Sequence, residues 1–277
     1  MPRAPRVTIG GIAYHVLNRA NARMTLFENE ADYQLMVSVL AEAHERVAMR
    51  TLGWCIMPNH WHLVLWPRGD GDLPEFMRWL TVTHTQRWHA AHGTAGTGHV
   101  YQGRYKSFPI QRTRPSRQQR SMGMLEGGDA VLSVLRYVER NPVRAGLSTR
   151  AETWRWSSAY QRANAEAESG DPSSPTAWGT VHSTTLDTLG SVTVPDPGQS
   201  ESGPEIPFSE PPTPLPADWL ELVNRPQSQK ELDALVRCIQ RGCPFGRDNW
   251  VRRMAAEWNI ESTLRPRGRP KKTRKGS

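Results

Sequence analysis

Hydrophobic and polar positions follow two different periods along the first part of the chain. Short apolar runs rich in β-branched and aromatic residues predict strands, and apolar residues spaced three or four positions apart predict helices. In chain order the predicted elements are a strand over 12–18, a helix over 30–47, two strands of a hairpin over 52–57 and 61–66, a helix over 73–90, a strand over 100–110 and a helix over 129–141. The order βαββαβα predicts an α+β sandwich of the ferredoxin-like class with its helices on one face of the sheet.

The region after residue 162 has a different composition. Between residues 165 and 216 there is no Lys or Arg, but there are eight acidic residues and ten of the 22 prolines. Such a segment buries too little apolar surface to offset its ordering entropy, so we expect a flexible acidic linker. Two helices, over 228–241 and 248–258, are predicted beyond it. They form either a helix-turn-helix-like DNA reader or a plain helical hairpin that packs on the main domain.

These patterns divide the chain into four predicted parts. Residues 1–162 form the main domain, 163–216 the linker, 217–262 the helical C-terminal segment and 263–277 a basic tail. The tail contains Arg267 and Arg269 within an Arg-Gly-Arg-Pro sequence that resembles an AT-hook, in which arginines enter the minor groove. Non-specific electrostatic binding of the same tail is the alternative interpretation.

Charge and cysteine usage narrow the class of protein. The 277 residues carry a formal charge of +8, and the chain without the acidic stretch holds 35 basic against 19 acidic residues, a balance of +16. Such an excess is typical of proteins that bind nucleic acid, although it also fits a basic soluble surface.

No run of 18 apolar residues and no signal-peptide pattern are present, so we expect no membrane association. The three cysteines, Cys55, Cys238 and Cys243, lack the spacing of metal ligands. We therefore expect a reduced, cytosolic protein.

Two histidines on a predicted strand are the first candidates for chemistry. His60 and His62 are two positions apart, so their side chains project from the same face of the strand. Two imidazoles on one stiff strand can share a divalent metal ion. The pair alone fits structural histidines equally well, so a partner is needed.

The helix predicted over 129–141 offers that partner. Tyr137 and Asn141 lie one turn apart at the flank of its apolar stripe. A tyrosine hydroxyl beside a bound metal is a plausible nucleophile for a phosphodiester. Asn141 would be an oxygen ligand suited to Mg²⁺ or Mn²⁺. In the alternative interpretation Tyr137 is a core-edge residue and Asn141 caps the helix, which is expected to end before Pro142.

Four segments together resemble a known family. The sequence Met-Pro-Asn-His-Trp-His-Leu at 57–63 resembles the His-hydrophobic-His signature of single-tyrosine HUH transposases. Residues 135–147, from Leu-Arg-Tyr-Val-Glu-Arg-Asn to Ala-Gly-Leu, are similar to the tyrosine helix of the REP-associated branch. Residues 98–108, with Tyr-Gln-Gly-Arg-Tyr-Lys-Ser, and residues 244–270 are also similar to that branch.

This resemblance implies an activity. The family binds Mg²⁺ or Mn²⁺, which His60, His62 and Asn141 would hold here, and its tyrosine, Tyr137, would cleave single-stranded DNA through a 5′-phosphotyrosine link. The implied partners are single-stranded DNA and hairpins of repetitive extragenic palindromes, and the implied state is a monomer or homodimer. A non-catalytic DNA-binding regulator and a metallonuclease with water as nucleophile are the alternatives.

Several basic and aromatic residues are candidates for DNA contacts. The residues on and beside the predicted strand and helix are Arg104, Tyr105, Lys106 and Arg144, with Arg19, Arg23 and Arg155 as further phosphate contacts. A run that departs from the family pattern adds Arg112, Arg114, Arg117 and Arg120. That run either contacts phosphates or is a tolerated surface insertion.

Overall fold

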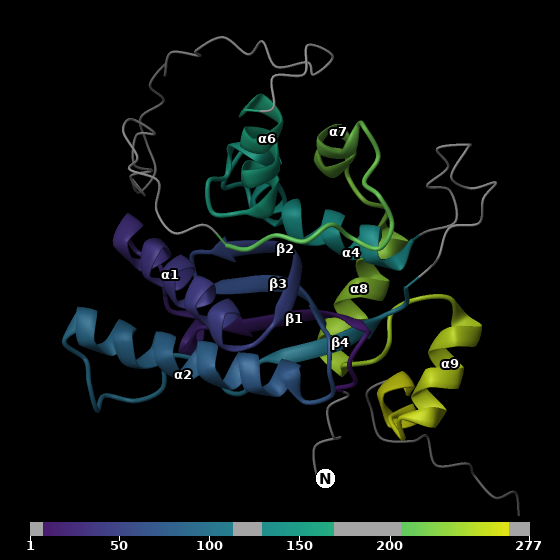
Figure 1. The fold of residues 1–277 in the computed structure, drawn as a ribbon, viewed down its shortest axis with the longest axis horizontal. Helices are drawn as coiled ribbons and strands as arrows, with labels where there is room; N and C mark the ends of the chain where they lie inside the picture. Colours follow the sequence, from purple (N-terminus) through teal and green to yellow (C-terminus); the bar gives the residue numbers. More distant parts are fainter. Residues whose placement is uncertain (1–7, 113–128, 169–205, 266–277) are drawn as a thin grey trace, which may run out of the picture.

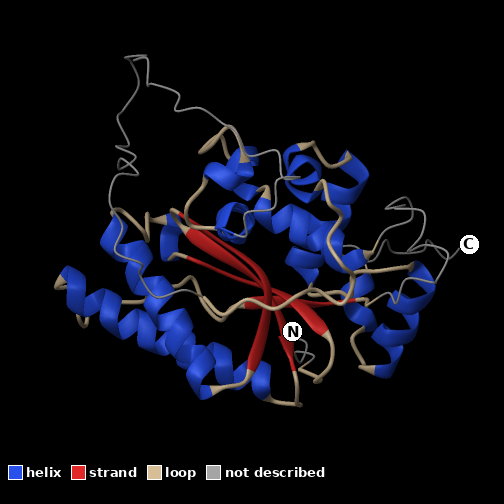
Figure 2. Cartoon of the chain, turned by 45° about the horizontal axis from the view of Figure 1, so that its top comes forward, coloured by secondary structure: helices blue, strands red, loops and turns tan. Residues whose placement is uncertain are grey.

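A four-stranded antiparallel sheet forms the centre of the molecule (Figures 1 and 2). The computed structural model describes residues 8–112, 129–168 and 206–265. The strands are β1 (Ala13–Arg19), β2 (Met49–Met57), β3 (His60–Pro67) and β4 (Lys106–Ile110), in the order β2-β3-β1-β4. The predicted order βαββαβα and the α+β class are confirmed.

Two long helices cover one face of this sheet. They are α1 (Glu30–Arg46) and α2 (Asp72–His92), which follow β1 and β3 in the chain. Helix α1 begins with a capping box, in which the Asn29 side chain accepts from the Asp32 amide and the Asp32 side chain bonds back to the cap. Their apolar faces bury alternate strand residues such as Trp61, so this half of the fold is a complete ferredoxin-like layer pair.

The opposite face is also covered, so the prediction that the helices lie on one face was wrong. Helix α4 (Ala130–Glu139) packs on β2 and β3 from that side and is labelled beside β2 in Figure 1. The reason is that the central strands are apolar on both faces. In β3, Leu63 is buried toward α1 and α2, whereas Val64 is buried toward α4.

The contact between α4 and β2 depends on a glycine. A Cβ atom on Gly53 would lie 2.5 Å from the Leu135 side chain of α4. The register of β2 against β3 shifts between Thr51 and Gly53, which marks a bulge. The absence of a side chain at Gly53 therefore lets the helix approach the sheet closely.

The strand predicted over 100–110 is shorter than expected. Only Lys106–Ile110 forms β4, and the residues before it run beside the end of β1, where the Gln102 amide bonds to the Arg19 carbonyl at 2.9 Å. Gly103 has a φ of 157°, which most residues adopt rarely. The apolar and aromatic residues of this segment suggested a strand, but the backbone turns away from the ladder.

The tyrosine helix ends before Pro142, as predicted, two residues earlier than the expected last residue Asn141. Helix α4 ends at Glu139, and a short helix, α5 (Asn141–Arg144), follows directly. Pro142 therefore does not end the helical segment. Proline is tolerated in the first turn of a helix, where its missing N–H group has no partner to lose.

The C-terminal segment packs on the main domain on the α4 side (Figure 1). The remaining helices are α6 (Ser158–Glu168), α7 (Trp219–Asn224), α8 (Gln229–Arg241) and α9 (Asp248–Glu257), with short 3-10 turns at Asn21–Arg23, Ala151–Thr153 and Glu261–Leu264. Helix α8 contacts β4, and Phe245 after it pairs with the strand through its amide and the Pro109 carbonyl at 2.9 Å. Of the two interpretations of the helical pair, docking on the main domain describes α8.

Both ends of the predicted linker are folded. Helix α6 reaches Glu168, and the Ser209 amide bonds to the Thr51 carbonyl of β2 at 2.9 Å. Residues 169–205 of the linker and the basic tail from residue 266, with Arg267 and Arg269, lie outside the described residues. None of the described helices combines the length and apolar character needed to cross a bilayer.

Candidate active site

Three histidines lie together on the face of the sheet that α4 covers. His60 and His62 project from β3, as the alternation predicted, and His15 projects from the neighbouring strand β1. The His60 and His62 ring centroids are 5.0 Å apart. His15 Nε2 lies 2.8 Å from His62 Nδ1, so one nitrogen donates a hydrogen bond and the other accepts it.

Burial keeps these imidazoles neutral. It lowers the pKa of His15 to about 3, an effect to which the His60 charge adds. The pKa of His60 falls to about 4, first through burial and then through the Arg19 and Arg144 guanidinium groups. His62 is 3% exposed, and burial together with the neighbouring histidines and arginines holds its pKa well below the ordinary value. Neutral imidazoles are the form that binds metal ions.

Tyr137 faces this histidine cluster from α4. Its ring centroid is 5.9 Å from that of His62 and 6.2 Å from that of His15, both in edge-on geometry. The helix is held in register because Val134 and Val138 are fully buried against the sheet. The fold thus brings together His60, His62 and Tyr137, which the sequence predicted from two separate segments.

Arg144 and Asn141 complete the surroundings of Tyr137. Arg144 Nη2 donates to the Tyr137 hydroxyl at 3.0 Å and also to Asn141 Oδ1, and its guanidinium carbon lies 4.3 Å from the centre of the Tyr137 ring. Asn141 Nδ2 donates to the Tyr137 carbonyl at 3.1 Å. Asn141 therefore caps α4 with its amide nitrogen, as the alternative interpretation expected, while its oxygen faces Arg144.

The donor atoms of the cluster fit a divalent metal. His62 Nε2 is buried and has no hydrogen-bond partner, and it offers a lone pair in the tautomer whose hydrogen lies on Nδ1. His60 Nδ1 lies 2.6 Å from Asn59 Oδ1, a contact that orients the ring and its other nitrogen. Within the described ranges no group of three or more His, Cys, Asp or Glu residues can hold a metal ion. Among the described residues, His60 and His62 are therefore candidate ligands as a pair and not as part of such a group.

Behind the tyrosine, α4 carries a buried carboxylate that sequence reasoning missed. Glu139 is fully buried and accepts from Ser158 Oγ at 2.7 Å, Arg162 Nε at 3.0 Å and Trp219 Nε1 at 2.7 Å. Trp219 is the first residue of α7, so this network joins the C-terminal segment to the tyrosine helix. Its only local signal is weak, a glutamate beside an apolar stripe.

Further contacts between α4 and the C-terminal segment use arginines. Arg136 Nη2 donates to the Arg225 carbonyl at 2.8 Å, and Arg140 Nη1 donates to the Val223 carbonyl at 3.2 Å. These carbonyls lie at the C-terminal end of α7, where a helix leaves them without partners. A small cavity of about 120 Å³ remains between Tyr137 and residues 226–232.

The other predicted DNA contacts lie in different places. Arg104 is exposed beside α2, Tyr105 is 7% exposed and Lys106 is exposed at the start of β4. Arg155 pairs with Glu30 at 2.5 Å. The remaining candidates are the exposed Arg23, Arg19 next to His60, and Arg112, which stacks on Trp66, whereas Arg114, Arg117 and Arg120 lie outside the described residues.

His15 is the residue of the cluster that the sequence did not single out. Its strand was predicted. His15 and Arg19 lie four positions apart on this strand, so both side chains face α4. The signal was therefore present in the alternation of β1. It could be used only with the strand order, which places β1 beside β3.

The described sheet carries His15, His60 and His62 opposite Tyr137 of α4, and part of the chain is similar to known proteins. Residues 8–120 match the family model of the IS200-like transposases. This part of the chain is therefore similar to the IS200-like transposases. No curated protein is similar enough to count as a match.

Two solved structures are similar to this chain at 18% sequence identity. One is a REP-associated tyrosine transposase bound to a REP hairpin, for which the alignment covers 66% of this chain and 100% of the other at a TM-score of 0.44. The second is a putative transposase from Deinococcus radiodurans, with 43% of this chain and 91% of the other covered at a TM-score of 0.31.

Proposed function

We propose that this protein is a metal-dependent strand transferase that acts on single-stranded or hairpin DNA through Tyr137. The observation that carries the proposal is the position of the Tyr137 ring 5.9 Å from that of His62, with its hydroxyl bonded to Arg144. A phenol, a pair of imidazoles and a guanidinium group thus lie close together on one face of the sheet. The sequence segments similar to the REP-associated branch support hairpins of repetitive palindromes as the substrate.

In the proposed reaction the Tyr137 oxygen attacks a DNA phosphorus atom. A bond forms between the tyrosine oxygen and phosphorus, and the bond from phosphorus to the 3′-oxygen breaks. The proton lost by the phenol is balanced by the proton that the leaving 3′-oxygen gains. The products are a 5′-phosphotyrosine and a free 3′-hydroxyl, and attack by another 3′-hydroxyl reverses the step. No water and no nucleotide cofactor are consumed.

The surrounding residues have distinct roles in this proposal. Arg144 holds the hydroxyl oxygen of Tyr137 and brings a positive charge to the phosphate. His60, His62 and the amide oxygen of Asn141 would hold Mg²⁺ or Mn²⁺, and the orphaned Nε2 of His62 supports this donor set. When bound, such an ion supplies positive charge that neutralises the phosphoryl oxygens.

The test is the formation of a covalent adduct. The protein is incubated with Mn²⁺ and 3′-labelled hairpin DNA that carries single-stranded flanks, and the products are separated on a denaturing gel. We expect a band that migrates with the protein and is lost in Tyr137→Phe. Tyr160→Phe on α6, the same substitution away from the histidine cluster, is the matched control and retains the adduct.

Other outcomes identify the alternative functions. A normal adduct from Tyr137→Phe refutes the assignment of the nucleophile. A released short labelled product without a shifted band supports a metallonuclease that uses water. DNA binding without any product over a broad set of hairpins supports the non-catalytic regulator.

A further inference from the structure

Two cysteines meet at the C-terminal end of α8, the helix that contacts β4. Cys238 lies in the last turn of α8, and Cys243 follows the helix by two residues. Gly242 has a φ of 71°, and its amide donates to the Cys238 carbonyl at 2.7 Å. Such a left-handed residue turns the chain back over the last helical turn, so Cys243 comes to lie against Cys238.

The two thiols are close enough to react with each other. Their sulfur atoms are 3.3 Å apart, and one thiol donates a hydrogen bond to the other. A disulfide bond is about 2 Å long, so the sulfur atoms need to approach by roughly 1 Å. Both cysteines are free in the structure. Any apolar pair can pack at these two positions of a helix end, but only a pair of thiols is open to oxidation.

The charge around Cys243 favours its reactive form. The hydrogen bond with Cys238 lowers the pKa of the Cys243 thiol, and the Arg237 and Arg241 guanidinium groups act in the same direction, whereas burial opposes them. The same hydrogen bond, together with burial, raises the pKa of the Cys238 thiol. Since the thiolate is the nucleophile toward a peroxide, Cys243 is the residue that reacts first.

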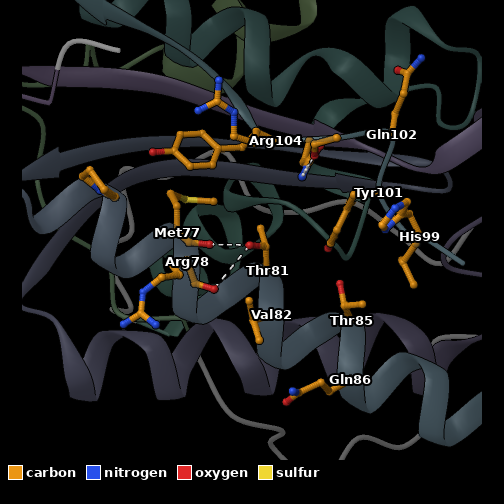
Figure 3. Close-up of a pocket in the computed structure, with 15 residues that line it drawn as sticks. Met77, Arg78, Thr81, Val82, Thr85, Gln86, His99, Tyr101, Gln102 and Arg104 are labelled. Atoms are coloured by element: carbon orange, nitrogen blue, oxygen red, sulfur yellow. Dashed lines mark hydrogen bonds between the residues drawn. The ribbon is translucent and has the colours of Figure 1, made fainter. Parts of the chain in front are cut away.

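A cavity adjoins the pair. Both cysteine side chains are almost fully buried, so only a small oxidant can reach them. The cavity has a volume of about 380 Å³ and is lined by both cysteines together with Arg237, Arg252 and Phe245, which leaves ample room for hydrogen peroxide. The larger cavity of about 800 Å³ between α2 and residues 99–105 has no cysteine among the described residues of its wall (Figure 3). The end of α8 is therefore the place where a cavity and a pair of thiols coincide.

We propose that Cys238 and Cys243 form a reversible disulfide when the protein is exposed to a hydroperoxide such as hydrogen peroxide. The Cys243 sulfur attacks one peroxide oxygen, the O–O bond breaks, and the products are a sulfenic acid and water. The Cys238 sulfur then attacks the Cys243 sulfur, the S–O bond breaks, and the hydroxyl leaves as water with the Cys238 proton. Two thiols and one peroxide thus give one disulfide and two water molecules, and a thiol reductant reverses the reaction. This chemistry does not depend on the strand transfer proposed for Tyr137.

The pair lies in the segment that docks on β4. The Phe245 carbonyl accepts from the Gln111 amide at 2.8 Å, and the ring centroids of Phe245 and Phe108 are 6.3 Å apart. The Phe108 ring in turn lies 4.9 Å from the His15 ring of the histidine cluster. A disulfide reduces the number of conformations open to residues 238–243 when this segment leaves the strand, so it should hold Phe245 on β4 more firmly.

Peptide mapping of the full chain tests the disulfide. The reduced protein is treated with hydrogen peroxide, the remaining thiols are alkylated with iodoacetamide in denaturant, and the digest is analysed by mass spectrometry. Trypsin cuts after Arg237, Arg241 and Arg247, so the disulfide joins peptides 238–241 and 242–247. We expect these linked peptides, lighter by two hydrogen atoms than the two thiol peptides together, and their separation by dithiothreitol.

Cys55 is the control within the same chain. Burial raises the pKa of its thiol, and its sulfur lies 3.6 Å from the Met57 thioether, which cannot form a disulfide. We expect Cys55 to stay available for alkylation, the linked peptides to form normally in Cys55→Ser, and no linked peptides in Cys243→Ser. The proposal is overturned if the paired thiols are oxidised no faster than Cys55, if the bond joins two chains, or if Cys243 gains oxygen without a link to Cys238.

Hydrogen exchange followed by NMR measures the effect on β4. The Gln111 amide, which donates to the Phe245 carbonyl, should exchange more slowly in the oxidised protein, by up to roughly fortyfold, the loop-closure value for a ring of six residues. The Ala20 amide, bonded to the Asn59 carbonyl at the opposite end of β1, should exchange at an unchanged rate. Faster exchange at Gln111 shows that the bond pulls the segment off β4, and equal exchange shows that docking does not respond to it. Either result overturns the stabilising effect.

Discussion

The buried ion pair between Glu139 and Arg162 should determine how firmly the tyrosine helix is held. Glu139 is fully buried and the Arg162 side chain is 7% exposed, with 3.0 Å between the carboxylate oxygen and Nε. Glu139→Met removes the charge that compensates Arg162 and leaves Trp219 Nε1 without its acceptor. Breaking one side of a buried pair costs about 3–5 kcal/mol. We expect the lower value, about 3 kcal/mol, because Arg162 still donates to the Leu52 carbonyl.

A double-mutant cycle isolates the interaction. Arg162→Met should also cost about 3 kcal/mol, since it leaves a buried carboxylate without its cation. The double variant, which replaces both charges by apolar side chains, should be no less stable than either single variant. The coupling free energy is then about 3 kcal/mol. The assay is urea unfolding followed by circular dichroism. The slope of the unfolding free energy against urea concentration should be the same in all variants, which checks two-state behaviour.

The surface ion pair of Glu42 and Arg87 is the control. Its side chains are 36% and 42% exposed, so Glu42→Met should cost less than about 1 kcal/mol. Two results would refute the reasoning: single variants at positions 139 and 162 that cost less than about 1 kcal/mol, or a double variant whose loss equals the sum of the two.

Two further predictions concern histidines. His15→Leu should weaken Mn²⁺ binding, measured by calorimetry without DNA, about 10–100-fold. In the proposed metal-binding tautomer His62 Nδ1 carries the hydrogen and donates it to His15 Nε2, an acceptor that the variant removes. His15→Gln retains an acceptor and should bind nearly as well, and equal affinity in His15→Leu contradicts the role. Burial lowers the pKa of His84 in the folded protein to about 3. Below pH 6.5 the unfolded chain therefore protonates His84 while the folded protein keeps it neutral. The free energy of unfolding consequently falls as the pH falls from 6.5 toward 3. From pH 7 to pH 5 this loss is about 2 kcal/mol, and His84→Gln should reduce the acid sensitivity of the urea midpoint by that amount; an unchanged sensitivity refutes it.

Much of the fold was accessible from local patterns. The order of helices and strands follows from apolar spacing within each element, and the shared face of His60 and His62 follows from strand alternation. Their meeting with Tyr137 required one further step, that the apolar stripe of α4 packs on the sheet. Helix α4 does pack on the sheet and bring Tyr137 to the histidines, as this step predicted. It covers the face opposite to the one that α1 and α2 cover.

The remaining features depend on contacts between distant segments. Residues 100–105 have the composition of a strand, but Tyr101 forms only an isolated bridge with Ala20, and the backbone at Gly103, with a φ of 157°, separates that bridge from β4. Arg144 contacts Tyr137 because a second short helix turns its side chain back. Neither interaction has a local sequence signal, so periodicity could not predict it.

The pairing of Phe245 with β4 and of Ser209 with β2 has a consequence for how the protein behaves when shortened. Both outer strands of the sheet are edges, and unpaired edges are sites of aggregation and strand exchange. Segments late in the chain occupy them, through the Phe245 amide and the Pro109 carbonyl at one edge and the Ser209 amide and the Thr51 carbonyl at the other. A chain cut at Pro216 retains the Ser209 pairing at the β2 edge and loses the Phe245 pairing at the β4 edge. Self-association of such a fragment would therefore report an exposed strand, whatever the DNA-binding role of the removed helices.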